Sequence, residues 1–241
     1  MNIAYISSPK GGVGKTTVTA NLSLSMQRLG YQVIAIDLDP QNSLRHHFAL
    51  DMHDARGLVT LLSPEINWQS YLLETPSGVS ILPYGQSNRN QKKAFDNKLT
   101  TMPSFLYEKL GQLVLSEKSI ILIDLPSGDS RALECIEKVP SVELIVLTAD
   151  GESAITLPLV MAGKKTFFII NQVFRPHRLN RDITDFYEQK LGSLLMGNIH
   201  KDEAVPESFS IKKSVFDYSP YSSFISDLDA ISRSLSRVFE F

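Results

Sequence analysis

The chain has 241 residues, 43% of them hydrophobic and 21% charged, and its 24 Lys and Arg against 26 Asp and Glu give a formal net charge of −2. This length can bury a sizeable core, and the composition excludes wholesale disorder and collagen-like repeats. A charge near zero gives no global field to hold DNA or an anionic membrane, so any such contact must come from a local patch. The single cysteine, Cys135, excludes an internal disulfide and a four-cysteine metal site, and with no visible targeting segment we expect a cytoplasmic protein.

Short apolar runs alternate with helical patterns along the whole chain. The expected strands cover residues 2–7, 33–36, 79–82, 120–123, 144–148 and 166–170, with a weaker one at 195–199. One expected helix follows the glycine loop at 9–14, and the others cover 103–115, 131–138, 182–191 and 224–238. The polar stretch 86–98 is expected to be an exposed loop. Strands that are apolar on both faces and separated by helices predict an α/β fold, with a doubly wound, mostly parallel sheet covered by helices on both faces, in one domain over residues 1–241.

The most informative motif lies between the first expected strand and the first expected helix, at Ser8-Pro9-Lys10-Gly11-Gly12-Val13-Gly14-Lys15-Thr16-Thr17. Glycines let successive backbone N–H groups point at one anion, and the start of a helix adds partial positive charge. Lys15 can then reach the β- and γ-phosphates of a nucleotide, and the Thr16 hydroxyl can bind Mg²⁺. The motif predicts a P-loop that contacts a nucleotide from Gly11 to Thr17; the alternative is a glycine-rich turn with an incidental lysine.

This loop departs from the standard pattern G-x-x-x-x-G-K-[ST], which wants glycine where Pro9 stands, and it carries an additional lysine, Lys10. The run from Lys10 to Thr17 resembles the deviant Walker A signature of the ParA/MinD family of ATPases, a MinD-like group of the SIMIBI class of P-loop NTPases. In that family the extra lysine reaches the partner subunit's phosphates in a nucleotide-sandwich dimer. The resemblance runs from residue 2 to about residue 213, and it implies a homodimer with ATP between the subunits and a catalytic role for Lys10 beside Lys15.

Three aspartates stand where that family places its Mg²⁺ and water-orienting groups. Asp37-Leu38-Asp39-Pro40-Gln41 follows the second strand and resembles the family's D-x-D-P-Q switch I segment, and Asp124 ends the strand 120–123 as a Walker B carboxylate does. By resemblance, Asp37 and Asp124 join Thr16 in organising Mg²⁺, and Asp39 orients or polarises the attacking water. We therefore expect a slow, Mg²⁺-dependent ATPase that a partner stimulates. Taken alone, each aspartate would suit a turn or a helix cap equally well.

The base is expected to be adenine. Asn171-Gln172-Val173-Phe174 lacks the aspartate of the N-K-x-D motif that pairs with guanine, and Asn171 stands where the family residue hydrogen-bonds adenine. The stretch Val205-Pro206-Glu207-Ser208 resembles the family's loop over the adenine, which implies base contacts for Pro206 and Glu207.

Three short stretches resemble one branch of the family, the MinD-like ATPases of bacterial cellulose-secretion operons: residues 42–48, 82–86 and 200–208. That resemblance implies a dimeric ATP switch that positions or regulates a membrane-associated cellulose synthesis and secretion machine. The expected partners are cellulose synthase components or small regulatory subunits, which would recruit the protein to the inner face of the inner membrane.

Other functions stay open. A ParA-type DNA partition ATPase needs a basic face, but Lys212, Lys213, Arg233 and Arg237 lie among acidic residues, so DNA binding is disfavoured. A MinD-type membrane switch would insert the apolar face of the helix 224–238, whose mixed charges fit packing on the sheet better. A non-hydrolysing scaffold is disfavoured by the three aspartates. The crowd of His and Asp at 46–54 suits a solvated segment better than a metal site.

Overall fold

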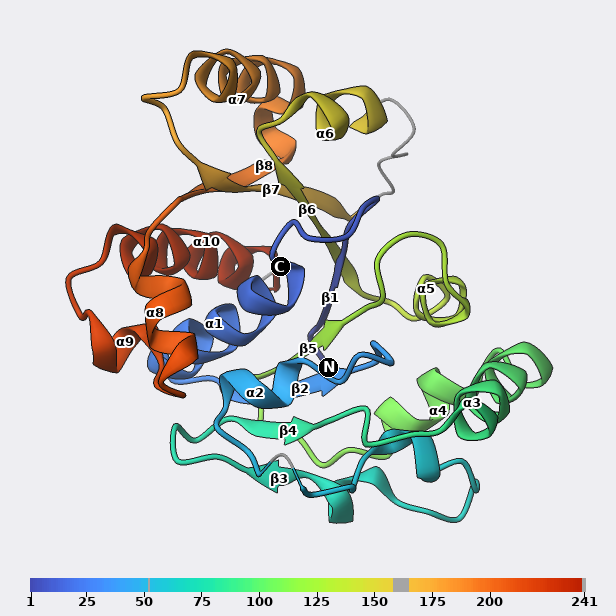
Figure 1. Cartoon of the computed structure of the whole chain (residues 1–241). Helices are drawn as coiled ribbons and strands as arrows, with labels where there is room; N and C mark the ends of the chain where they lie inside the picture. Colours follow the sequence, from blue (N-terminus) through green and yellow to red (C-terminus); the bar gives the residue numbers. More distant parts are fainter. Residues whose placement is uncertain (52, 158–164, 240–241) are drawn as a thin grey trace.

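The computed structural model describes residues 1–51, 53–157 and 165–239, and its strands form one eight-stranded sheet (Figure 1). The strands lie in the order β3-β4-β2-β5-β1-β6-β7-β8, and every neighbouring pair is parallel except β3–β4. Their bounds are β1 Ile3–Ser7, β2 Gln32–Asp37, β3 Leu73–Glu74, β4 Ser80–Leu82, β5 Ser119–Asp124, β6 Val142–Thr148, β7 Thr166–Val173 and β8 Leu195–His200. The predicted doubly wound sheet is confirmed, including the weak strand β8.

Helices cover both faces of this sheet. They are α1 Lys15–Arg28, α2 Leu44–His47, α3 Arg89–Thr101, α4 Phe105–Gly111, α5 Arg131–Ile136, α6 Gly151–Thr156, α7 Arg178–Leu191, α8 Ala204–Ser210, α9 Val215–Tyr218 and α10 Ser223–Phe239. Short 3₁₀ turns add η1 Leu58–Thr60, η2 Trp68–Tyr71 and η4 Gly192–Leu194. Successive residues of a buried strand face opposite sides, so Ala4 and Ile6 of β1 pack under α1 and α10, whereas Ile3 and Tyr5 pack with α3–α5.

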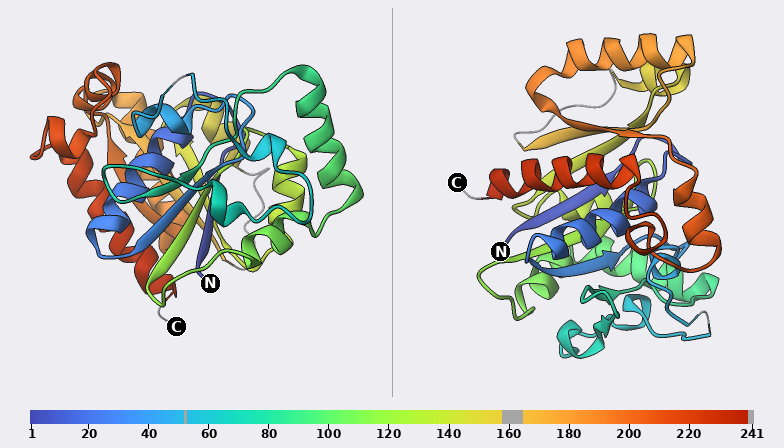
Figure 2. Two further views of the ribbon diagram at one scale, coloured as in Figure 1. Left: turned by 90° about the horizontal axis from the view of Figure 1, so that it is seen from below. Right: turned by 90° about the vertical axis from the view of Figure 1, so that its left-hand side faces the viewer.

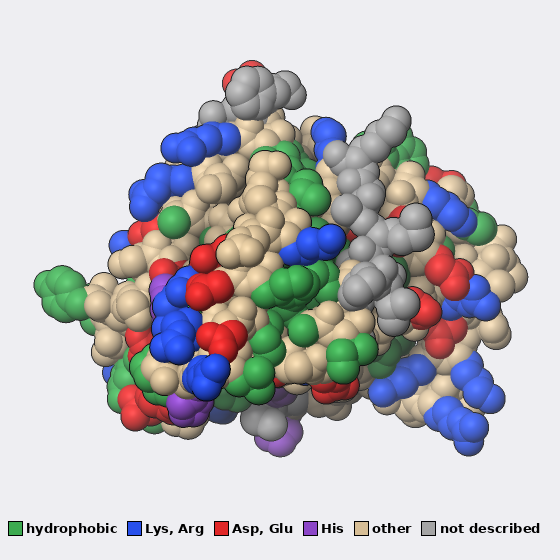
Figure 3. Space-filling view, turned by 90° about the horizontal axis from the view of Figure 1, so that it is seen from above, with side chains coloured by type: hydrophobic (Ala, Val, Ile, Leu, Met, Phe, Trp, Pro, Cys, Tyr) green, Lys and Arg blue, Asp and Glu red, His purple; other side chains and the backbone are tan. Residues whose placement is uncertain are grey.

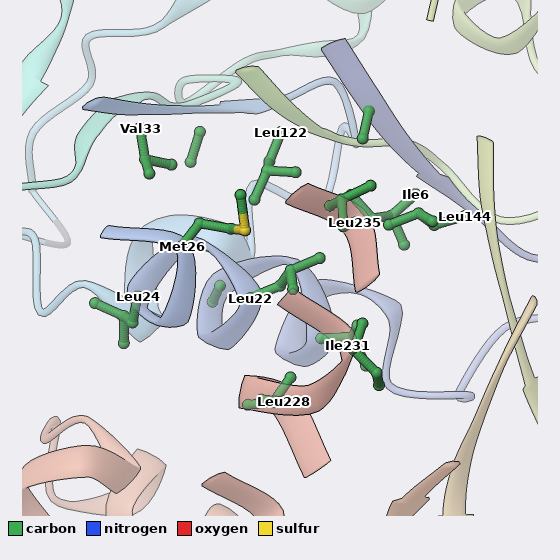
Figure 4. Packing of buried hydrophobic residues seen from close by; sticks show 14 of the residues in the cluster. Ile6, Leu22, Leu24, Met26, Val33, Leu122, Leu144, Leu228, Ile231 and Leu235 are labelled. Carbon is green, nitrogen blue, oxygen red and sulfur yellow. The ribbon is translucent and has the colours of Figure 1, made fainter. Parts of the chain in front are cut away.

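The C-terminal helix packs into the core, as its apolar face predicts. Helices α1 and α10 lie side by side (Figure 2), and Leu228, Ile231 and Leu235 of α10 lie beside α1 and the sheet (Figure 4). These three side chains are fully buried, so the apolar face of α10 packs in the protein core and stabilises the fold. None of the helices that the structure describes is both long and apolar enough to cross a bilayer.

The expected exposed loop over residues 86–98 is wrong, because α3 begins at Arg89. Asn88 caps it: the Asn88 side chain accepts a hydrogen bond from the Gln91 N–H, and the Gln91 side chain accepts one from the Asn88 N–H, each at 3.0 Å. Only Phe95 and Leu99 are buried, so the apolar signal of this helix is weak.

The outer end of the sheet carries α6 and α7. Figure 3 shows this face, where Lys and Arg side chains lie among Asp and Glu. Arg175, at the foot of α7, pairs with Asp185 at 2.8 Å and with Glu188 at 2.7 Å. Among the described residues, the charges on this face are therefore mixed in sign.

Candidate functional site

The phosphate loop connects β1 to α1 at the carboxyl edge of the sheet. Gly12 and Gly14 have φ of 79° and 84°, a left-handed conformation that favours glycine. The Gly14 carbonyl accepts the first helical hydrogen bond, from the Val18 N–H at 2.9 Å. A Cβ on Gly14 would stand 2.4 Å from the Asn171 Nδ2. Glycine is thus required at position 14 both for backbone conformation and for the close approach of β7.

Lys15, Thr16 and Asp124 meet beneath this loop. The Lys15 Nζ lies 3.9 Å from Asp124 Oδ1, and the Thr16 hydroxyl donates to Asp124 Oδ2 at 2.7 Å. Thr19, which the sequence analysis missed, also reaches Asp124, at 3.1 Å, and donates to the Lys15 carbonyl at 3.0 Å. The structure therefore brings together the P-loop lysine, the hydroxyl and the strand-end carboxylate that the motifs predict as a group.

Asp37 and Asp124 occupy paired positions at the ends of β2 and β5, and both are fully buried. Burial, with repulsion from Asp124, raises the pKa of Asp37 well above its usual range, although the N–H groups of Asp39 and Leu44 donate to its carboxylate. Burial also raises the pKa of Asp124 to about 6, with Lys15 and the two threonine hydroxyls opposing the rise. Two adjacent carboxylates and a hydroxyl form a donor set of hard oxygens, which fits Mg²⁺.

Asp39 lies on the turn that follows β2, beside these two carboxylates. Its side chain is half-buried and accepts a hydrogen bond from the Gln41 N–H at 2.8 Å. The carbonyl of the next residue, Pro40, accepts from Lys92 Nζ of α3 at 3.2 Å. A contact with α3 therefore supports the turn that carries Asp39.

Lys10 is held within its own chain by two carboxylates that the sequence analysis did not identify. Its Nζ lies 2.9 and 2.8 Å from the two Asp150 oxygens and 3.3 Å from Glu152. Asp150 also caps α6 by accepting from the Ser153 N–H at 2.9 Å. Burial opposes ionisation of both partners, but the hydrogen bonds prevail: the pKa of Lys10 rises and that of Asp150 falls to about 2.

A cavity of about 360 Å³ opens beside the phosphate loop, bordered by Gly14, Thr17, Asn171 and Pro206. Asn171 is 5% exposed, and its Nδ2 donates to the Val13 carbonyl at 2.7 Å. The cavity therefore lies directly beside Gly14 and Thr17 of the phosphate loop.

The stretch 205–208, expected as a loop, lies within helix α8 instead. Pro206 borders the cavity, whereas Glu207 does not: its carboxylate accepts from the Tyr218 hydroxyl at 3.0 Å. The cavity wall also includes His47 and His200, neither of which the sequence analysis assigned to the site. Burial lowers the pKa of His47 to about 4, so this ring is neutral, and it packs on Phe209 with centroids 4.6 Å apart.

The doubly wound sheet, together with a glycine loop that has Lys10 on one side and Lys15 on the other, is typical of P-loop ATPases of the ParA/MinD kind. A structure of MinD with Mg-ADP from Pyrococcus horikoshii superposes with a TM-score of 0.77 at 23% identity, covering 98% of this chain and 96% of that one. The ATP complex of an aspartate-to-alanine variant of McdA from Cyanothece gives a TM-score of 0.78 at 16% identity, with 98% and 96% covered.

The chain belongs to the BcsQ family, because the family model described as "Cellulose biosynthesis protein BcsQ" matches residues 1–234. The protein of that name from Escherichia coli K12 is 29% identical over 90% of this chain and 87% of its own length.

Proposed function

We propose that this protein is a Mg²⁺-dependent ATPase that acts as an ATP-gated dimeric switch in bacterial cellulose biosynthesis. The observation that carries the ATPase proposal is the grouping of Lys15, Thr16, Asp37 and Asp124 around one glycine loop. The Mg-ADP in the Pyrococcus MinD structure and the ATP in the McdA complex support the ATPase proposal. The name of the family model supports the role in cellulose biosynthesis.

The residues divide the chemistry among themselves. The N–H groups of the loop and Lys15 would bind the phosphates, and Thr16, Asp37 and Asp124 would hold Mg²⁺, which neutralises phosphate charge. Asp39, on its turn, would orient the attacking water. Phosphoryl transfer depends on positioning, so loss of this carboxylate should slow hydrolysis far more than it weakens binding.

Lys10 would couple ATP binding to dimer formation, and this coupling is called the gate below. In the single chain its ammonium is committed to Asp150 and Glu152, so it can contact a partner subunit's phosphates only by leaving them. When ATP is bound, the Lys10 ammonium can break its contacts with Asp150 and Glu152 and bind the triphosphate of the partner subunit instead. The dimer forms when the new contacts are more favourable than the ones that break.

The gate is tested by the mass of the protein in light scattering, with ATP, in an Asp39→Ala background that keeps ATP intact. Asp150→Asn weakens the internal pair, so it should raise the dimer fraction at a given ATP concentration, while Lys10→Ala should abolish the dimer. Glu134→Gln, which removes the exposed Arg131 ion pair on α5, is the matched control and should change nothing. An Asp150→Asn protein that dimerises no more readily than the control would contradict the gate.

The cellulose role is tested by capturing tagged Asp39→Ala protein with ATP from its native cells. Cellulose synthase subunits or small regulatory subunits, absent from a parallel Lys15→Ala capture, would support the role. Centromere-binding protein, with salt-sensitive, ATP-dependent retention on duplex DNA, would assign the protein to partition instead. Co-sedimentation of the purified protein with liposomes would assign it to a membrane switch.

A further inference from the structure

The cavity beside the phosphate loop would hold the base of the proposed nucleotide and is called the base cavity below. Its wall contains a histidine whose ring is hydrogen-bonded to an aspartate from a distant part of the chain. His200 ends β8, and Asp227 lies in the first turns of α10. The His200 Nδ1 lies 2.9 Å from Asp227 Oδ2, and the His200 backbone N–H donates to the same oxygen at 2.8 Å. The Asp227 side chain is 18% exposed and the His200 side chain is 45% exposed, so the aspartate is the more buried partner of the pair.

That pairing decides which ring nitrogen carries the proton. A carboxylate only accepts hydrogen bonds, so Nδ1 must be the donor, and Nε2 of the neutral imidazole is then an acceptor. Within residues 1–51, 53–157 and 165–239, the only side-chain partner of His200 is Asp227. In the neutral form of the ring, Nε2 is therefore an acceptor of fixed polarity on a side chain that borders the cavity.

Most other ionic and amide groups around the cavity have partners within the chain. Asn171 is anchored too: its Nδ2 donates to the Val13 carbonyl at 2.7 Å, so its Oδ1 is a second acceptor of fixed polarity beside His200. Lys201 and Glu203 pair with each other at 2.9 Å, and Asp202 accepts from the Ala204 N–H at 2.9 Å and the Ser222 hydroxyl at 2.5 Å. Gln172 borders the cavity too, but its amide can turn over and offer either a donor or an acceptor. A side chain that can turn over satisfies any base, whereas a fixed acceptor distinguishes bases.

We propose that His200 Nε2 accepts a hydrogen bond from the 6-amino group of adenine and so selects ATP against 6-oxopurine nucleotides, with Asp227 as the positioning residue. This inference rests on the proposed nucleotide function. A 6-oxopurine presents a carbonyl oxygen at that position, so two acceptors would face each other, and neither could be satisfied without a water. Discrimination of this kind arises because the wrong partner leaves a polar group unpaired.

The experiment compares the affinities of ATP and ITP, because inosine differs from adenosine only in the 6-position and the adjacent ring nitrogen. Titration calorimetry with Mg²⁺ in the Asp39→Ala background measures both. With His200 in place, the affinity for ATP should exceed the affinity for ITP by about tenfold. His200→Gln keeps a hydrogen-bonding group but frees its polarity, so ITP should bind more tightly and the ratio should fall to within about threefold of one.

Three further variants separate positioning from damage. Asp227→Asn keeps an acceptor oxygen facing Nδ1 and should retain the preference, whereas Asp227→Ala frees the tautomer and should reduce it. His53→Ala removes an exposed histidine that does not line the cavity and is the matched control. Lys15→Ala should weaken ATP and ITP by equal factors, because it acts on the phosphates.

The outcomes separate this inference from the proposed function. An ATP/ITP ratio near one in the parent protein, or a ratio that His200→Gln leaves unchanged, would overturn the role of His200 while leaving the ATPase intact. A folded parent protein that bound neither nucleotide would overturn both.

Discussion

The buried pair Asp37 and Asp124 should make the nucleotide-free protein lose stability as the pH rises. Burial raises the pKa of Asp124 from 3.8 to about 6. Because the folded chain then holds this proton more tightly than the unfolded chain, its contribution to stability is present below the unfolded pKa and is lost as the pH rises through the folded one. The shift of about 2 units, at roughly 1.4 kcal/mol per unit, corresponds to about 3 kcal/mol between pH 4 and pH 7.

Asp124→Asn removes the charge while keeping the hydrogen bonds. The amide oxygen can accept from Thr16, and the amide N–H can donate to Thr19, whose own proton goes to the Lys15 carbonyl. Relative to wild type, the variant should therefore gain up to about 3 kcal/mol in its free energy of unfolding between pH 4 and pH 7. It should also lose Mg²⁺-dependent hydrolysis.

The assay is urea unfolding with EDTA and without nucleotide, repeated across that pH range. Asp129→Asn, at an exposed position on the loop after β5, is the control and should give a difference that does not change with pH. If the advantage of Asp124→Asn were the same at pH 4 and pH 7, or shrank as the pH rose, the argument from the buried carboxylates would be refuted.

Three predictions concern stability and reactivity elsewhere. Gly57→Ala would place a Cβ 2.2 Å from the Gly85 backbone, so it should lower the free energy of unfolding by about 3 kcal/mol; a urea midpoint equal to wild type would contradict this. Lys109 is 1% exposed and donates to three carbonyls of residues 63–66. Lys109→Met should therefore lower the free energy of unfolding by about 3 kcal/mol in the same assay. A loss of stability no larger than that caused by the same substitution at an exposed lysine would refute this. Buried Cys135, whose thiol pKa is raised by burial, should react with a thiol reagent only after unfolding; rapid native labelling would show otherwise.

The parts of the site that sequence predicted are those whose chemistry is local. The glycine loop needs its special backbone conformations within a few residues, and Asp37 and Asp124 follow apolar strands whose ends meet at one edge of a parallel sheet. Each could be located from its neighbours in sequence.

The parts that sequence missed depend on contacts between distant residues. Asp150 meets Lys10 across 140 positions because β6 lies beside β1, and His200 meets Asp227 only because α10 packs on β8. Helix α3 was missed for another reason: it buries only Phe95 and Leu99, so its apolar periodicity is faint.

The hydrogen bond from Asn171 to the Val13 carbonyl joins the base cavity directly to the phosphate loop. One amide thus borders the cavity and also supports the backbone that would hold the phosphates. Energies measured separately for the base and for the triphosphate should therefore not sum to the affinity of the whole nucleotide. A double-mutant cycle that pairs a change at Asn171 with one at Lys15 should yield a coupling energy well away from zero, even though the two side chains would contact opposite ends of the same molecule.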